Sequence, residues 1–156
     1  MGLTNDRNDP RLGRINERGL QEAYLIDGRN DNEFVRPIRT AYKHVGSPGP
    51  EYPLRDLTEE EHERYDKYGY VKFEPYPQDG KNVLGQYWTQ DRLDKIGKGC
   101  GVVTTMHQKL AETYAREPKF YGATYCAGCQ THLPVGKAGE FVWVDETGVT
   151  NERVGT

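Results

Sequence analysis

The chain has 156 residues, which suits one domain and is enough to bury a core. Only 35% of its residues are hydrophobic, and its 18 Gly and 9 Pro predict that turns and irregular backbone take a large share. Its 21 basic and 24 acidic residues give a net charge of −3, which excludes a global basic field that would attract nucleic-acid phosphates.

The first third of the chain is rich in turn-forming residues. Residues 1–33 predict an irregular N-terminal arm, broken by one short strand at Ala23-Tyr24-Leu25-Ile26. Residues 34–45 are richer in strand formers. Because Pro37 cannot donate to a ladder, we expect this segment to lie at a sheet edge or to be broken in two.

The middle of the chain carries one clear helix signal. Thr58 followed by Glu61 is a capping box, which predicts a surface helix over about 59–68 that ends at Gly69. A short strand is expected at 71–74, and residues 78–101 are expected to be mostly loop.

The last third begins with a second helix and then becomes β-rich. Thr105 is the expected N-cap of a helix over about 105–117, which Pro118 ends. Strands are expected at 120–125, 132–135, 141–144 and 149–154. These elements predict a loop-rich α+β fold within a single domain, 1–156. It would contain two short helices, small antiparallel sheets and a C-terminal zinc-ribbon-like β subdomain of zinc knuckle and β-hairpin over 100–156.

A Cys-x-x-Cys pair, Cys126 and Cys129, is the strongest chemical signal. Two thiolates at this spacing can grip one tetrahedral ion, and an odd total of three cysteines favours metal ligation over disulfides. Cys100, between two glycines, is the expected third ligand. His132 is the expected fourth ligand of a Zn²⁺ site, with His107 and then His44 as the alternatives.

Other uses of the thiols fit the sequence less well. No helix is expected to begin at Cys129, so the pair lacks the setting of a redox-active motif. An iron–sulfur cluster on four thiolates would lack one thiolate. The His-x-Glu element of zinc deaminases and the His-Glu-x-x-His element of metalloproteases are both missing. We therefore expect a structural zinc rather than an enzyme, and no small-molecule substrate.

Basic and aromatic residues are interleaved in residues 34–45. Such a patch could stack bases and hold phosphates, although a solvated strand edge explains it as well. The candidate nucleic-acid-binding residues are Arg36, Arg39, Tyr42 and Lys43.

Residues Phe120 to Val135, which include the Cys pair and His132-Leu133-Pro134-Val135, resemble small uncharacterised proteins of tailed phages and prophages, as do Arg39 to Gly46 and Tyr52 to Tyr70 upstream. The resemblance implies a viral origin and no mechanism. With no apolar run that would span a membrane and no signal peptide, we expect the host cytoplasm or a virion. The expected role is a non-enzymatic interaction protein with a host or viral protein partner. A virion structural component and a nucleic-acid-binding regulator are the alternatives.

Overall fold

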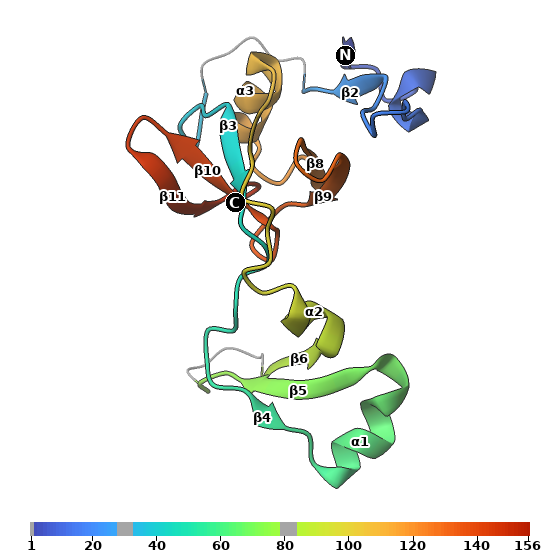
Figure 1. Ribbon diagram of the computed structural model, residues 1–156, viewed down its shortest axis with the longest axis vertical. Helices are drawn as coiled ribbons and strands as arrows, with labels where there is room; N and C mark the ends of the chain where they lie inside the picture. Colours follow the sequence, from blue (N-terminus) through green and yellow to red (C-terminus); the bar gives the residue numbers. More distant parts are fainter. Residues whose placement is uncertain (1, 28–32, 79–83) are drawn as a thin grey trace. The chain divides into compact units, whose positions relative to one another are not determined.

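The computed structural model describes residues 2–27, 33–78 and 84–156. These residues form three short α-helices and several small, mostly antiparallel sheets (Figure 1), so the α+β prediction is confirmed. The chain divides into two compact units, here called unit 1 and unit 2. Unit 1 comprises Met1–Gly46 and Gly99–Thr156, and unit 2 comprises Ser47–Lys98. None of the helices in the described ranges is long and apolar enough to cross a membrane.

Unit 1 is built on a four-stranded antiparallel sheet with strand order β11-β10-β3-β7. The strands are β3 (Ala41–His44), β7 (Val103–Thr105), β10 (Phe141–Asp145) and β11 (Gly148–Arg153). β3 is an inner strand, so the expected edge position is wrong. The strand begins after Pro37, so the proline lies outside the paired residues and its missing N–H removes no hydrogen bond from the sheet.

One face of this sheet carries the core of unit 1. Tyr42 packs edge to face with Phe141 and Trp143, and Trp143 packs edge to face with Tyr114 of α3 (Gln108–Arg116). The expected N-cap Thr105 instead ends β7, and the side chain of His107 caps the helix by accepting a hydrogen bond from the Lys109 N–H. Strand pairing of residues 103–105 with β3 therefore overrides the capping signal.

A separate hairpin, β8 (Ala123–Cys126) and β9 (Thr131–Pro134), holds the Cys-x-x-Cys turn at its tip. The buried Cys126 belongs to the same core cluster as Tyr42 and Phe141. The hairpin thus brings the cysteine pair against the core face of the four-stranded sheet.

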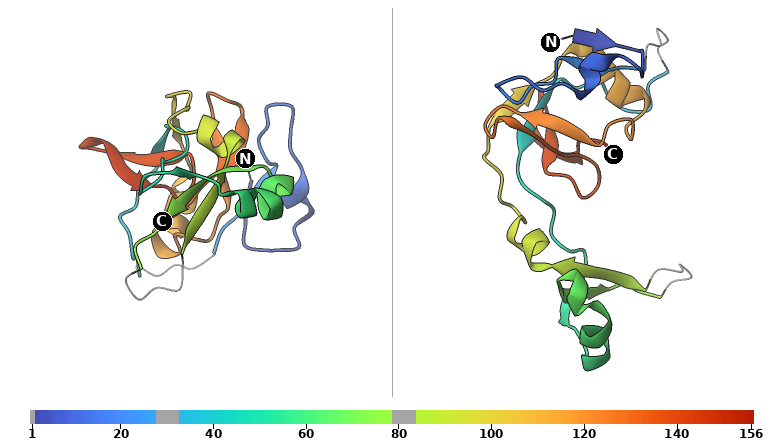
Figure 2. Two further views of the ribbon diagram at one scale, coloured as in Figure 1. Left: turned by 90° about the horizontal axis from the view of Figure 1, so that it is seen from below. Right: turned by 90° about the vertical axis from the view of Figure 1, so that its right-hand side faces the viewer.

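The N-terminal arm is part of unit 1 and packs on the β8–β9 hairpin of its own chain. Two short strands, β1 (Gly2–Thr4) and β2 (Ala23–Leu25), form a parallel pair, with a 3₁₀ turn (Pro10–Gly13) between them. Figure 2 shows the arm in blue beside the orange hairpin, where the Tyr125 hydroxyl donates to the Arg18 carbonyl oxygen at 3.0 Å. Of the expected arm, residues 1 and 28–32 lie outside the described residues.

Unit 2 is a three-stranded antiparallel sheet of order β4-β5-β6 with two helices. The strands are β4 (Arg55–Asp56), β5 (Tyr70–Pro75) and β6 (Gly85–Thr89), and the helices are α1 (Glu59–Tyr65) and α2 (Gln90–Asp94). α1 has the expected capping box, has no buried residue, and continues as a 3₁₀ turn (Asp66–Tyr68) to Gly69. β6 and α2 correct the expectation of a loop over 78–101, of which 79–83 lie outside the described residues.

The core of unit 2 surrounds a buried carboxylate. Glu74 is 1% exposed and accepts four hydrogen bonds, from the Glu51 and Tyr52 backbone N–H groups, the Gln86 amide and the Trp88 indole. Its desolvation disfavours the charge, but these donors outweigh it and lower the pKa of Glu74. The carboxylate therefore ties the 51–52 segment to β5 and β6.

Candidate metal centre

Four side chains from three separate segments of unit 1 meet beside its core. His44 ends β3, Cys100 precedes β7, and Cys126 and Cys129 flank the turn between β8 and β9. One possible ligand atom from each lies within 4.8 Å of the other three. These four residues are close enough to bind one metal ion.

The spacing of the donor atoms suits a single tetrahedral ion. The Sγ atoms of Cys100 and Cys126 lie 3.4 Å apart, and His44 Nδ1 lies 3.8 Å from Cys126 Sγ and 3.5 Å from Cys129 Sγ. Zinc–ligand bonds of about 2.0–2.3 Å in a tetrahedron separate the ligand atoms by about 3.5–3.8 Å. The donors therefore stand close to the separations that a bound zinc ion would require.

Glycines allow the backbone segments to come this close together. A Cβ atom at Gly128, inside the Cys turn, would lie 2.6 Å from Cys100 Sγ and 2.8 Å from a methyl group of Val102. At Gly99 it would lie 2.2 Å from the His44 carbonyl oxygen. Since ordinary Cβ contacts are longer than this, a side chain at either position would push Cys100 away from its neighbours.

Glu140 orients the imidazole of His44. Its Oε1 lies 3.0 Å from His44 Nε2, and both side chains are almost fully buried. A carboxylate can only accept this hydrogen bond, so Nε2 carries the proton and Nδ1 faces the three thiols. A carboxylate behind the imidazole is the usual outer-shell partner of a metal-ligating histidine.

The backbone around the cysteines also directs hydrogen bonds at the donor atoms. The Cys129 N–H points at Cys126 Sγ at 3.4 Å. The Cys100 N–H donates to the Nδ1 lone pair of His44 at 3.2 Å, and a metal ion bound at Nδ1 would replace this hydrogen bond. The N–H of Gln130 closes the turn on the Cys126 carbonyl oxygen at 2.7 Å. The Cys129 and Gln130 contacts fix the turn in the form expected of a metal knuckle.

The electrostatics of the group favour a cation. Desolvation opposes ionisation of Cys100, but hydrogen bonds from the Val102 N–H, His44 and the two other thiols outweigh it and lower its pKa to about 7. Desolvation, then the neighbouring Cys126 and Cys100, raise the pKa of Cys129 to about 11. The Cys100 thiolate thus forms readily, and its negative charge disfavours ionisation of the neighbouring thiol. A bound divalent cation would remove this repulsion between thiolates.

The pKa of His44 is raised, whereas burial alone would lower the pKa of a histidine. Burial lowers the pKa of its imidazole, but the hydrogen bond to Glu140 and the contact with Cys100 outweigh burial, so the pKa lies above its ordinary value. A positive charge is therefore favoured at the position where a metal ion would share the Nδ1 lone pair.

The structure brings together Cys100, Cys126 and Cys129, as expected, but their fourth neighbour is His44, the last of the three candidate histidines, and not the expected His132. Pairing of β3 with β7 and β10 carries His44 to the cysteines, and strand alternation places it on the same face as Tyr42. No pattern in the sequence indicates Glu140, because only the fold brings it opposite His44.

The two other candidate histidines have different roles. His132 Nε2 lies 3.0 Å from the Tyr24 hydroxyl, and its ring packs against Tyr24 and Tyr125, so it holds the N-terminal arm. Burial lowers the pKa of His132. His107 is the exposed N-cap of α3.

The candidate nucleic-acid-binding residues do not form one surface patch. Tyr42 is in the core, and Arg39 is 7% exposed, forms an ion pair with Glu152 and stacks on Trp143. Arg36 is exposed and donates to backbone carbonyl oxygens, including that of Thr156. Buried Tyr42 and Arg39 are not available to stack bases or hold phosphates.

Comparison of the chain with protein-family models, with curated proteins and with solved structures found no match.

Proposed function

We propose that this chain is a non-enzymatic interaction protein whose unit 1 is stabilised by one Zn²⁺ bound to His44, Cys100, Cys126 and Cys129. The observation that carries the proposal is the cluster of three thiols and one imidazole at tetrahedral separations. Three thiolates and one imidazole form a donor set typical of structural zinc.

A structural role follows from the number of protein donors. Four protein ligands complete a tetrahedral zinc and leave no position for a water molecule, whereas a catalytic zinc keeps one position open. The carboxylate nearest the group, Glu140, is already bonded to His44 Nε2 and is not free to act as a general base. The arrangement therefore favours stabilisation of the fold over catalysis.

Aromatic side chains on unit 2 support an interaction role. Tyr65, Tyr70 and Tyr87 are half-buried and stack on one another across α1, β5 and β6, and Tyr68 beside them is 59% exposed. Tyrosine is enriched in protein–protein interfaces because it offers a large ring and a wet hydroxyl. Such a surface suits a protein partner.

The metal content of the purified chain tests the zinc proposal. After dialysis, we expect close to one equivalent of zinc per chain by plasma mass spectrometry, and a strong chelator should unfold unit 1. Less than about half an equivalent, with unit 1 still folded in the chelator, would contradict it. Hydrolytic or deaminase activity that the chelator abolishes would contradict the non-enzymatic role.

The two alternative functions, a virion structural component and a nucleic-acid-binding regulator, stay predictions from the sequence. An N-terminal arm that lies across neighbouring subunits would favour a virion component, but the described part of the arm is hydrogen-bonded to the hairpin of its own chain through Tyr24 and Tyr125. Identification of the chain in purified phage particles would support that alternative.

A further inference from the structure

The strand β7 is an open edge of the four-stranded sheet. It pairs with β3 and, in the part of the chain that the structure describes, with no strand on its other side. Val102 and Met106 direct their backbone groups toward β3: the Val102 carbonyl oxygen accepts from His44, and the Met106 N–H donates to Thr40. Because strand residues alternate, Val103 and Thr105 direct their N–H and carbonyl groups away from the sheet.

Two exposed apolar side chains lie at this edge, one in β7 and one just before it. Val102 is 40% exposed and Val103 is 48% exposed. Edge strands are commonly protected by charges, prolines or bulges, since their free backbone groups can pair with another chain. The residues of β7, Val-Thr-Thr, carry none of these protections.

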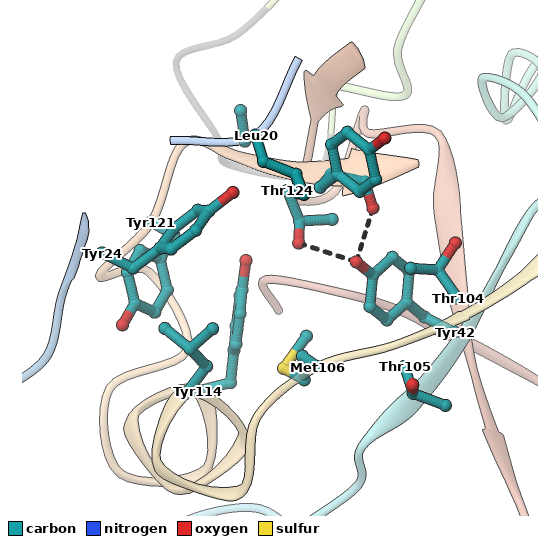
Figure 3. A pocket seen from close by; sticks show the side chains of 12 residues that line it. Leu20, Tyr24, Tyr42, Thr104, Thr105, Met106, Tyr114, Tyr121 and Thr124 are labelled. Atoms are coloured by element: carbon teal, nitrogen blue, oxygen red, sulfur yellow. Dashed lines mark hydrogen bonds between the residues drawn. The ribbon is translucent and has the colours of Figure 1, made fainter. Parts of the chain in front are cut away.

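A pocket lies next to this edge, on the core face of the sheet (Figure 3). Its volume is about 80 Å³, and Thr104, Thr105 and Met106 form one wall. Tyr114 and Tyr121 line it from another side, and Tyr42 lines it with a hydroxyl already bonded to Thr124 and to the Tyr125 carbonyl oxygen. A cavity that holds benzene measures about 150 Å³, so this pocket fits only a few heavy atoms, such as the end of one aliphatic side chain.

We propose that the β7 edge and this pocket form one docking site for an extended peptide segment of a protein partner. The segment adds as a fifth strand beside β7 and inserts one aliphatic side chain into the pocket. This inference rests on the proposed interaction role and names the partner's chemistry.

An extended backbone is the occupant that this geometry selects. Val103 and Thr105 each offer one donor and one acceptor in the plane of the sheet, and only another strand satisfies both at that spacing. The partner residue opposite Thr104 points to the same face as Thr104, which is the face where the pocket lies. Backbone pairing therefore delivers a side chain to the pocket.

The face of the sheet opposite the pocket indicates which charge the partner segment should carry on either side of its inserted aliphatic residue. Lys43 lies between Val142 and Val103 in the sheet, so its direct cross-strand neighbours supply no carboxylate. Acidic residues on either side of the inserted aliphatic residue point to this outward face, where Val103 and Lys43 lie. An aliphatic residue flanked by glutamates thus matches both faces of the edge.

The test uses the zinc-loaded full chain and an acetylated, amidated hexapeptide, Thr-Glu-Leu-Glu-Thr-Val, in a titration followed by amide NMR shifts. We expect saturable shifts at Val103, Thr105 and Thr124. Replacing the leucine of the peptide with glycine should weaken binding about 10-fold or more, because the pocket then stays unfilled.

Two pairs of variants distinguish strand pairing at the β7 edge from nonspecific binding of the peptide. Val103→Pro removes a donor that faces away from β3, so it should abolish binding, whereas Val103→Thr keeps that donor and should bind. Ala123→Leu fills the pocket from its rim and should weaken binding. Thr131→Leu adds the same side chain at an exposed position of β9 outside the pocket and should not.

Zinc content and thermal unfolding are measured on every sample, so failure of this inference is distinguishable from failure of the zinc proposal. A zinc-loaded, folded chain that shows no saturable shift at β7 with several millimolar peptide would overturn the docking site. Binding that survives Val103→Pro would do the same. Concentration-dependent shifts of these amides without peptide would assign the edge to a second copy of the chain and also refute the inference.

Discussion

Replacement of Glu140 by glutamine should weaken the proposed zinc binding without changing any of the four proposed ligands. Glu140→Gln keeps the shape of the side chain and an oxygen that accepts the His44 Nε2–H hydrogen bond, but it removes the negative charge 3.0 Å from that nitrogen. Both side chains are almost completely buried, so water does not replace the lost charge. The imidazole becomes less basic and a poorer ligand.

The size of the effect follows from the contact that is lost. Removing an outer-shell partner typically costs about 10–100-fold in metal affinity. A charge-assisted hydrogen bond is roughly twice as strong as a neutral one, and glutamine retains the neutral bond. We therefore expect about a 10-fold loss for Glu140→Gln, equivalent to about 1.4 kcal/mol, and a loss nearer 100-fold for Glu140→Ala.

Competition with a chromophoric chelator of known zinc affinity, at fixed pH and ionic strength, measures this change. Glu146→Gln is the matched control, because Glu146 lies in the exposed turn between β10 and β11 and should leave the affinity unchanged. If Glu140→Gln binds zinc within about twofold of the original chain while folded, Glu140 does not support His44 as a ligand, and the reasoning fails.

Four further predictions concern the two units separately. Cys126→Ser, or a strong chelator, should unfold unit 1 and leave unit 2 folded. Amide NMR should then lose the dispersed signals near Trp143 and keep those near Trp88, and simultaneous loss of both sets would contradict the prediction. Glu74→Gln should destabilise unit 2 by about 2–4 kcal/mol in denaturant unfolding, because charge-assisted bonds weaken and one donor loses its acceptor. Because the pKa of Glu74 is lowered by folding, its contribution is present above the unfolded-state pKa and is lost as the pH falls through the folded-state pKa, which acid titration of unit 2 measures. Gly128→Ala should displace Cys100 and reduce zinc affinity in the same chelator competition, whereas alanine at Gly122, where a Cβ meets nothing within 4 Å, should be neutral.

The features that the sequence predicted well are those set by neighbouring residues. The capping box at Thr58 and Glu61 forms because both partners lie within one helical turn. The Cys126–Cys129 turn depends only on residues 126–130, and its hairpin strands flank it directly. Such elements need no knowledge of the rest of the fold.

The features that it missed depend on distant pairing. β6 and α2 were expected to be loop, but β6 pairs with β5 and its Trp88 is bonded to Glu74. Thr105 carried a helix-capping signal, yet pairing with Ala41 keeps it in a strand. The inner position of β3, which decides the place of His44, follows from pairing with a strand about 100 residues further along the chain.

The insertion of unit 2 between His44 and Cys100 has a consequence for the order of events during synthesis. His44 leaves the ribosome first, but the ligand set is complete only when Cys129 has been made, 31 residues after the last residue of unit 2, Lys98. At about 5–20 residues per second this interval lasts roughly 2–6 s, whereas small domains fold in microseconds to seconds. Unit 2 therefore has time to fold before the proposed ligands of unit 1 are complete. Because folded unit 2 shortens the flexible chain between His44 and Cys100, bringing these two residues together at the proposed metal centre costs less conformational entropy.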